Sequence, residues 1–76
     1  METAERVAKV VERLYNLTPE NYDEPLTGPE YRLSGVLMVY LFYEIEHEFQ
    51  IIIPYNRLFD YSFNTVNKIA KIIDTL

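Results

Sequence analysis

Four polar residues in the middle of the chain have types and spacing that could support chemistry. Ser34 stands at the expected start of a helix, where unpaired backbone N–H groups and the helix dipole favour an anion. This position suits a phosphate ester on the serine, and it equally suits an ordinary N-cap. Glu44, His47 and Glu48 have the i, i+3, i+4 spacing of metal ligands on one helix. These residues are therefore candidates for two kinds of site, a modified serine and a metal centre.

The rest of the composition argues against a metal centre and against an enzyme. Di-iron bundles need two Glu-x-x-His motifs and further glutamates, whereas this chain has a single histidine. It has no cysteine for thiolate ligands or thiol catalysis, and no sequence feature links His47 to Ser34 as a base. We therefore expect no metal ion, no catalytic residue and no enzymatic activity. We interpret Glu44, His47 and Glu48 as a solvated helix end.

These candidates belong to the most apolar stretch of the chain, which predicts one amphipathic helix. The helix is expected to begin after Ser34 and to end near Phe49. Helical spacing places five apolar residues on one face: Met38, Leu41, Phe42, Ile45 and Phe49. On the opposite side Val36, Tyr40 and Tyr43 are also apolar or aromatic. A helix that is apolar on both sides is either buried twice or has a partner.

A first helix is predicted over residues 3–15, with Thr3 as its N-cap and Glu2 paired with Arg6. A long connection follows over residues 16–33, where three of the four prolines argue against a continuous helix. Long connections in small domains are usually fastened by their own apolar residues. The candidates for this role are Leu17, Tyr22, Leu26, Tyr31 and Leu33.

The C-terminal part of the chain predicts two more helical segments. Residues 55–63 form a short one that can cover the end of a bundle with the apolar side chains Leu58, Phe59, Tyr61 and Phe63. The last helix spans residues 64–76, with Asn64 as its N-cap. Its apolar stripe consists of Val66, Ile69, Ala70, Ile73 and Leu76.

Length and charge limit the classes of function. Seventy-six residues make one domain, residues 1–76, with one small core. The formal charge of −5 and the scattered basic residues argue against nucleic acid and against anionic membrane surfaces. The longest apolar run, residues 36–43, is too short to span a bilayer, and the N-terminus lacks the apolar centre of a signal peptide. We expect a cytoplasmic protein.

Three stretches of the chain carry a resemblance to acyl carrier proteins. E-I-E-H-E-F followed by I-I-I-P, over residues 44–54, is similar to the acidic end and Ile-x-Ile-Pro exit of the family's second helix. F-N-T-V, residues 63–66, resembles the Ile-Thr-Thr-Val start of its final helix. P-L-T-G-x-x-x-x-L-S-G, from residue 25 to residue 35, resembles the acyl carrier-related proteins of peptide-maturation systems. The resemblance implies an all-α, acyl carrier protein-like four-helix bundle with a long first loop and a short third helix.

The family attaches 4′-phosphopantetheine to the serine of an Asp-Ser-Leu motif at the start of its second helix. Ser34 lies in this region, but Arg32 and Leu33 precede it and Gly35 follows it. Aligned without gaps from Phe49, Gly35 itself takes the place of the serine. The resemblance therefore leaves two alternatives. One is a carrier-derived docking or adaptor module without a cofactor, and the other is a working acyl or peptidyl carrier with 4′-phosphopantetheine on Ser34.

The expected partner surface also departs from the family. Ordinary carriers present acidic residues along this helix to basic patches on their enzymes, whereas here Leu37, Tyr40 and His47 stand at three of these positions. We predict a more apolar contact with a biosynthetic or maturation enzyme, or with a second copy in a homodimer. The residues expected to make this contact are Val36, Leu37, Tyr40, Tyr43, Glu44 and His47. Leu26 and Tyr31 offer a rival explanation, because they could cover the patch within the monomer.

Overall fold

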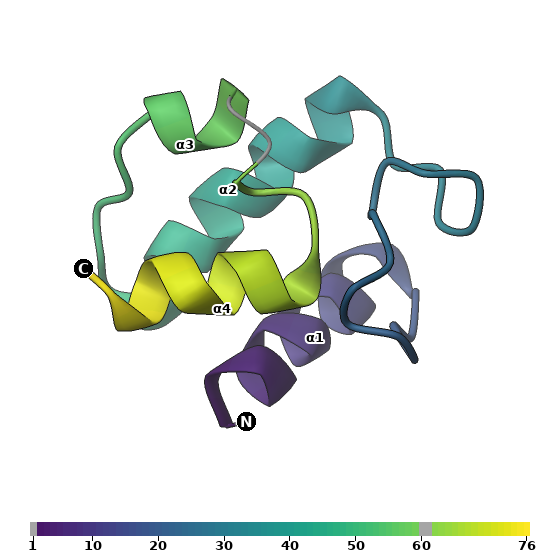
Figure 1. The fold of residues 1–76 in the computed structure, drawn as a ribbon, viewed down its shortest axis with the longest axis horizontal. Helices are drawn as coiled ribbons and strands as arrows, with labels where there is room; N and C mark the ends of the chain where they lie inside the picture. The colour runs from purple at the N-terminus through teal and green to yellow at the C-terminus, as the bar shows by residue number, and fades with distance from the viewer. Residues whose placement is uncertain (1, 60–61) are drawn as a thin grey trace.

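The computed structural model describes residues 2–59 and 62–76, so Tyr61 and its predicted role lie outside the described residues. The described residues form four helices and no strand: α1 (Glu2–Tyr15), α2 (Gly35–Phe49), α3 (Asn56–Phe59) and α4 (Val66–Asp74) (Figure 1). The prediction of an all-helical bundle is confirmed, as are the long first connection and the short third helix.

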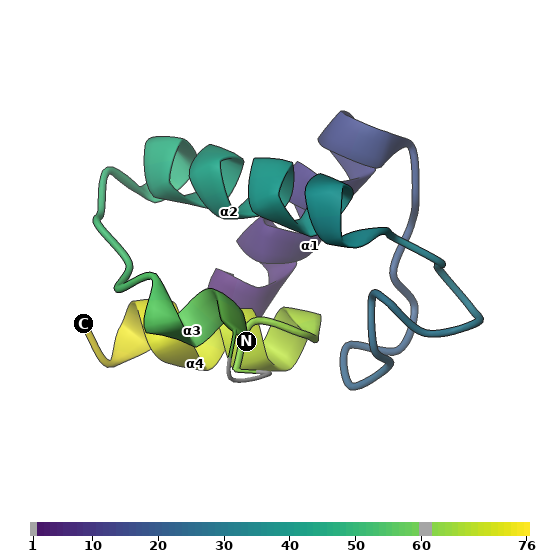
Figure 2. The same cartoon turned by 90° about the horizontal axis from the view of Figure 1, so that it is seen from above.

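The bundle is built around α1, which packs against both α4 and α2. Figures 1 and 2 show the long connection at the end of the molecule where α1 ends and α2 begins, away from the C-terminus. The radius of gyration over Cα atoms is 10.9 Å. A single folded domain of this length is expected to have about 11 Å, so the helices share one core.

The core gathers apolar side chains from α1, α2, α4 and the connections between them. The largest fully buried side chains are Val7, Val11, Leu26, Leu41, Phe42, Ile45, Ile53, Val66 and Ile69. The predicted inner face of α2 is confirmed, since four of its five residues are buried and Phe49 is half-buried. Phe42 is central, because its ring packs against Phe63 at 5.4 Å and stacks on Tyr55 at 5.7 Å between centroids.

The start of α4 lies one residue later than predicted. Thr65 is the N-cap, and its hydroxyl accepts a hydrogen bond of 3.0 Å from the backbone N–H of Lys68. Asn64 instead forms hydrogen bonds with the long connection. The Asn64 carbonyl accepts from the N–H of Leu26 at 2.8 Å, and the Asn64 side chain accepts from the hydroxyl of Thr27 at 3.0 Å. The tertiary contact therefore decides which of two good capping residues caps the helix.

Three other expectations at the ends of the elements are wrong. The N-cap assigned to Thr3 fails because α1 already begins at Glu2, and the Thr3 hydroxyl donates to Asp74 at 2.8 Å instead. Leu76 lies beyond the end of α4 and is exposed, so it does not extend the apolar stripe. Phe59 does not close the bundle, since it is 75% exposed.

The long connection is fastened to the start of α4, as its apolar residues predicted. Leu26 and Leu33 are buried, and the N–H of Leu33 donates to the carbonyl of Leu26 at 3.0 Å. Asn67 in α4 is bound twice: its backbone N–H donates to the carbonyl of Tyr22 at 3.1 Å, and its amide donates to the carboxylate of Asp23 at 2.9 Å. Hydrogen bonds therefore join the connection to the first turn of α4.

Candidate functional site

Ser34 is the N-cap of α2, as predicted. Its hydroxyl accepts a hydrogen bond of 3.3 Å from the backbone N–H of Leu37, and its carbonyl accepts one of 2.9 Å from the N–H of Met38. The side chain is exposed, and the first turn of α2 contains no acidic residue. A Cβ on Gly35 would meet no atom within 4 Å, so the fold leaves room for a side chain beside Ser34.

An apolar hollow of about 200 Å³ lies next to the start of α2. Its apolar lining comes from α2, α3 and the segment before α4, and consists mainly of Met38, Val39, Leu58, Phe59 and Phe63. Gly35 also lines it, which places Ser34 one residue from its edge. The hollow can accept an aliphatic or aromatic group.

The outer side of α2 carries large apolar and aromatic side chains that the other described residues leave exposed. Val36 is 65% exposed, Tyr40 is 61% exposed and Tyr43 is 47% exposed. The long connection does not shield them, because Leu26 is buried in the core and Tyr31 is half-buried against it. The rival explanation, in which these loop residues bury the patch, is therefore wrong. We call Val36, Tyr40 and Tyr43, together with Tyr55, the aromatic surface.

Tyr55 extends the aromatic surface from α2 to the segment that leads into α3. Its hydroxyl lies 3.2 Å from the hydroxyl of Tyr43, and both rings pack on the buried Phe42. The hydrogen bond to Tyr55 raises the pKa of Tyr43 above its ordinary value, and the negative charge of a deprotonated Tyr55 would raise it further. Sequence reasoning missed Tyr55, because residue spacing within one helix cannot place a residue from the next segment.

Leu37 differs from the other predicted contact residues of the first turns, because it is not exposed. Its side chain is half-buried and packs on the core. The hydroxyl of Tyr15 donates a hydrogen bond to its backbone carbonyl. Burial raises the pKa of Tyr15, and the neighbouring Tyr40 raises it further. Leu37 thus marks the boundary between the buried and exposed sides of α2.

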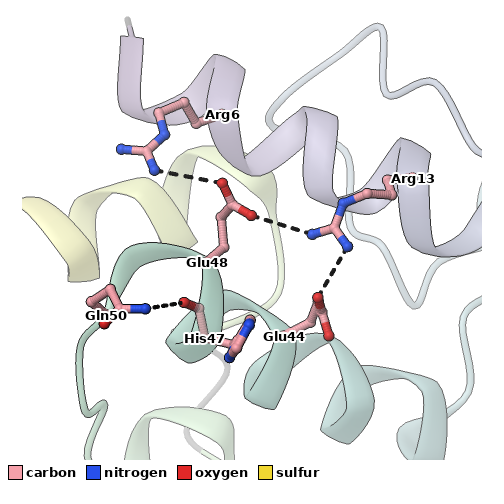
Figure 3. A network of polar contacts seen from close by, with 6 residues as sticks. All are labelled: Arg6, Arg13, Glu44, His47, Glu48 and Gln50. Carbon is pink, nitrogen blue, oxygen red and sulfur yellow. Dashed lines mark hydrogen bonds and ion pairs between the residues drawn. The ribbon is translucent and has the colours of Figure 1, made fainter.

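The acidic end of α2 is joined to α1 by a network of ion pairs (Figure 3). Arg13 contacts Glu44 at 3.0 Å and Glu48 at 3.4 Å, and Arg6 contacts Glu48 at 3.6 Å. Figure 3 shows both carboxylates turned towards α1 and the imidazole of His47 turned away from it. The predicted solvated helix end is thus partly correct, since His47 is exposed while the two carboxylates are engaged by α1.

This network has two consequences for the predicted site. Arg6 pairs with Glu48 across the helix interface, not with Glu2 along α1 as predicted. Glu44, which was predicted to meet a partner, already binds Arg13 within the chain. Within residues 2–59 and 62–76, no group of three or more His, Cys, Asp or Glu side chains is placed to hold a metal ion.

Comparisons of the chain with protein-family models, with curated proteins and with solved structures find no match. In the part of the chain that the structure describes, no helix has the length and apolar character needed to cross a membrane. Three local features of the molecule bear on its function: the capped serine, the apolar hollow beside it and the aromatic surface.

Proposed function

We propose that the chain is an acyl carrier-related, carrier-like bundle that acts as a docking or adaptor module in a biosynthetic or peptide-maturation pathway. The exposed aromatic surface supports this proposal more than any other observation. Val36 and Tyr40 are mostly exposed to water and add little to the stability of the domain, whereas contiguous exposed apolar side chains usually mark a binding site. Tyrosine anchors also commonly dominate the energy of such contacts.

The partner in this proposal is an enzyme with an apolar docking site, and charge contributes little to the contact. The first turn of α2 contains no acidic residue, and Glu44 and Glu48 farther along are already paired with α1. Exposed charge pairs are the interactions that salt screens. Binding should therefore change little when the salt concentration is raised from about 0.1 M to about 0.5 M, where the Debye length falls below about 5 Å.

Tyr40→Lys tests the proposal, with Ile52→Lys as a matched control. Tyr40 belongs to the aromatic surface, whereas Ile52 is even more exposed but lies beyond the end of α2. We expect Tyr40→Lys to abolish binding to the enzyme that co-purifies with the wild type from the producing cells, and Ile52→Lys to retain it. Both variants should unfold within about 0.5 kcal/mol of the wild type, because each changes an exposed side chain.

Three results would count against docking through this surface. The first is that the wild type, Tyr40→Lys and Ile52→Lys all bind the same proteins. Another is a large loss of stability in Tyr40→Lys, which would place Tyr40 in the core. The third is a wild-type dimer that Tyr40→Lys dissociates, measured by sedimentation equilibrium. That result would assign the surface to a second copy of the chain.

In the proposed module, Ser34 carries no cofactor and serves as an N-cap. Its hydroxyl accepts from the first turn of α2, and Arg32 stands near the place where a carrier has an acidic residue. The second candidate is a working carrier, which the apolar hollow next to Ser34 favours, because a carried group could occupy it. Incubation with a promiscuous phosphopantetheinyl transferase and coenzyme A, followed by intact mass measurement, separates the two. A mass gain that disappears in Ser34→Ala would overturn the cofactor-free module.

A further inference from the structure

A second hollow, of about 300 Å³, lies between α3 and α4 and is lined by basic side chains. Arg57 comes from α3, and Lys68 and Lys71 come from successive turns of α4. Thr75 and Ile72 complete the α4 side. No carboxylate is among the residues that line it within the described part of the chain. Three of the seven basic residues therefore share one hollow in a chain whose net charge is −5.

Unlike the arginines of α1, these three cations have no anionic partner among the residues that the structure describes. Arg6 and Arg13 are both ion-paired with glutamates of α2. Arg57, Lys68 and Lys71 form no ion pair with any residue that the structure describes. The nearest acidic residue of α4, Asp74, accepts a hydrogen bond from Thr3 of α1. Among the described residues, the fold therefore brings three like charges together and places no counter-charge in ion-pair contact with them.

We propose that this basic hollow binds the phosphate or diphosphate group of a small molecule. An anion between the three side chains would replace mutual repulsion by charge-assisted hydrogen bonds. The planar guanidinium of Arg57 can bind two phosphate oxygens, while Lys68 and Lys71 act as point charges.

The shape and charge of the surroundings favour a small anion over a polyanion. Nucleic acids are bound along stripes of basic residues on strongly basic domains, whereas here three cations line one hollow of an acidic chain. A volume of about 300 Å³ lies at the lower end of the range for small-molecule sites. The hollow shares no lining residue with the aromatic surface, so the inference stands independently of the docking function.

Inorganic pyrophosphate is the probe, titrated into ¹⁵N-labelled protein at constant ionic strength and followed by amide chemical shifts. We expect saturable shifts at Arg57, Lys68, Lys71 and Thr75. Lys68→Gln/Lys71→Gln should weaken binding at least about tenfold, since a hydrogen bond to a charged group is worth that much or more in affinity. Lys9→Gln is the control, because Lys9 is an exposed lysine of α1 outside the hollow and should not change the affinity.

The proposal is overturned by any of three results. Sodium chloride at the same ionic strength could produce equal shifts, which would show general screening. The double variant could bind pyrophosphate as tightly as the wild type, which would place the anion elsewhere. Finally, the chain could bind vesicles of phosphatidylserine and phosphatidylcholine but not pyrophosphate, which would assign the cations to a membrane surface. Amide shifts that match the wild type far from each substitution show that Lys68→Gln/Lys71→Gln and Lys9→Gln remain folded.

Discussion

The two sides of α2 are similar in composition and different in their surroundings. The inner side presents Met38, Leu41, Phe42 and Ile45 to the core, and all four are buried. The outer side presents Val36, Tyr40 and Tyr43, and all three are exposed. Both sides are equally compatible with a buried helix when they are judged by hydrophobicity alone. What separates them is that α1 packs on one side while the described residues leave the other uncovered.

This difference shows how a small domain divides its apolar residues between folding and contact. The residues of the inner side are aliphatic or phenylalanine, which have no polar group to satisfy in the core. The outer side carries two tyrosines, whose hydroxyls remain in water while their rings are available to a partner. Exposed tyrosine is therefore the feature that distinguishes a contact surface from a core face on this helix.

The largest effect that would test this division is expected for Phe42→Ala. Phe42 is completely buried and its ring contacts those of Tyr43, Tyr55 and Phe63. Removing a buried phenylalanine ring costs about 3 to 5 kcal/mol of unfolding free energy. Tyr40→Ala, on the outer side of the same helix, should cost about 0.5 kcal/mol or less. Urea denaturation of both variants measures the contrast, and equal losses would show that the two sides of α2 do not differ.

A smaller loss of stability is expected from a change at Ser34, the N-cap of α2. Ser34→Ala removes the hydroxyl that accepts from the N–H of Leu37 and should cost about 1 kcal/mol. Ser34→Asp is the control, because aspartate caps a helix as well as serine and should keep the stability of the wild type. Thermal unfolding measures both. A loss in Ser34→Asp equal to that in Ser34→Ala would mean that the serine acts in some way other than capping.

The smallest effect concerns Tyr15, at the boundary between the two sides. Tyr15→Phe removes the hydrogen bond to the carbonyl of Leu37 and should cost about 0.5 kcal/mol, since that carbonyl keeps its place in the helix. The folded chain raises the pKa of Tyr15 above its ordinary value of 10.0. The unfolded chain therefore releases this proton first, and the stabilisation is complete below pH 10 and lost as the pH rises through the folded value.

Unfolding by urea at several pH values tests this dependence. The difference in unfolding free energy between the wild type and Tyr15→Phe should be constant from pH 7 to about pH 9 and should shrink above about pH 10, where tyrosine ionises. A difference that grows in alkali would show that the folded state favours the tyrosinate. Tyr43 and Tyr55 are present in both proteins, so the comparison isolates Tyr15.

Local patterns in the sequence predicted α2 well because local forces determine it. Ser34 is a strong N-cap, and the apolar spacing from Met38 to Phe49 fits a single helix that ends where predicted. The same reasoning missed the start of α4 by one residue. Asn64 and Thr65 are both good capping residues, and only the contact of Asn64 with Leu26 in the long connection decides between them.

Features that depend on contacts between distant segments could not be predicted in this way. The pair expected within α1, between Glu2 and Arg6, does not form. Arg6 instead pairs with Glu48, near the end of α2. Arg57 belongs to α3 but shares one hollow with Lys68 and Lys71 of α4. Residue spacing describes one helix at a time, whereas these groupings arise only when helices pack together.

The packing of α1 against α4 also determines when the protein can fold during its synthesis. α1 is made before α4, yet it packs against α4, which ends at Asp74. Contacts between such distant segments slow folding, because a long loop must close before they form. On the ribosome, the side of α1 that packs against α4 therefore stays uncovered until α4 has emerged.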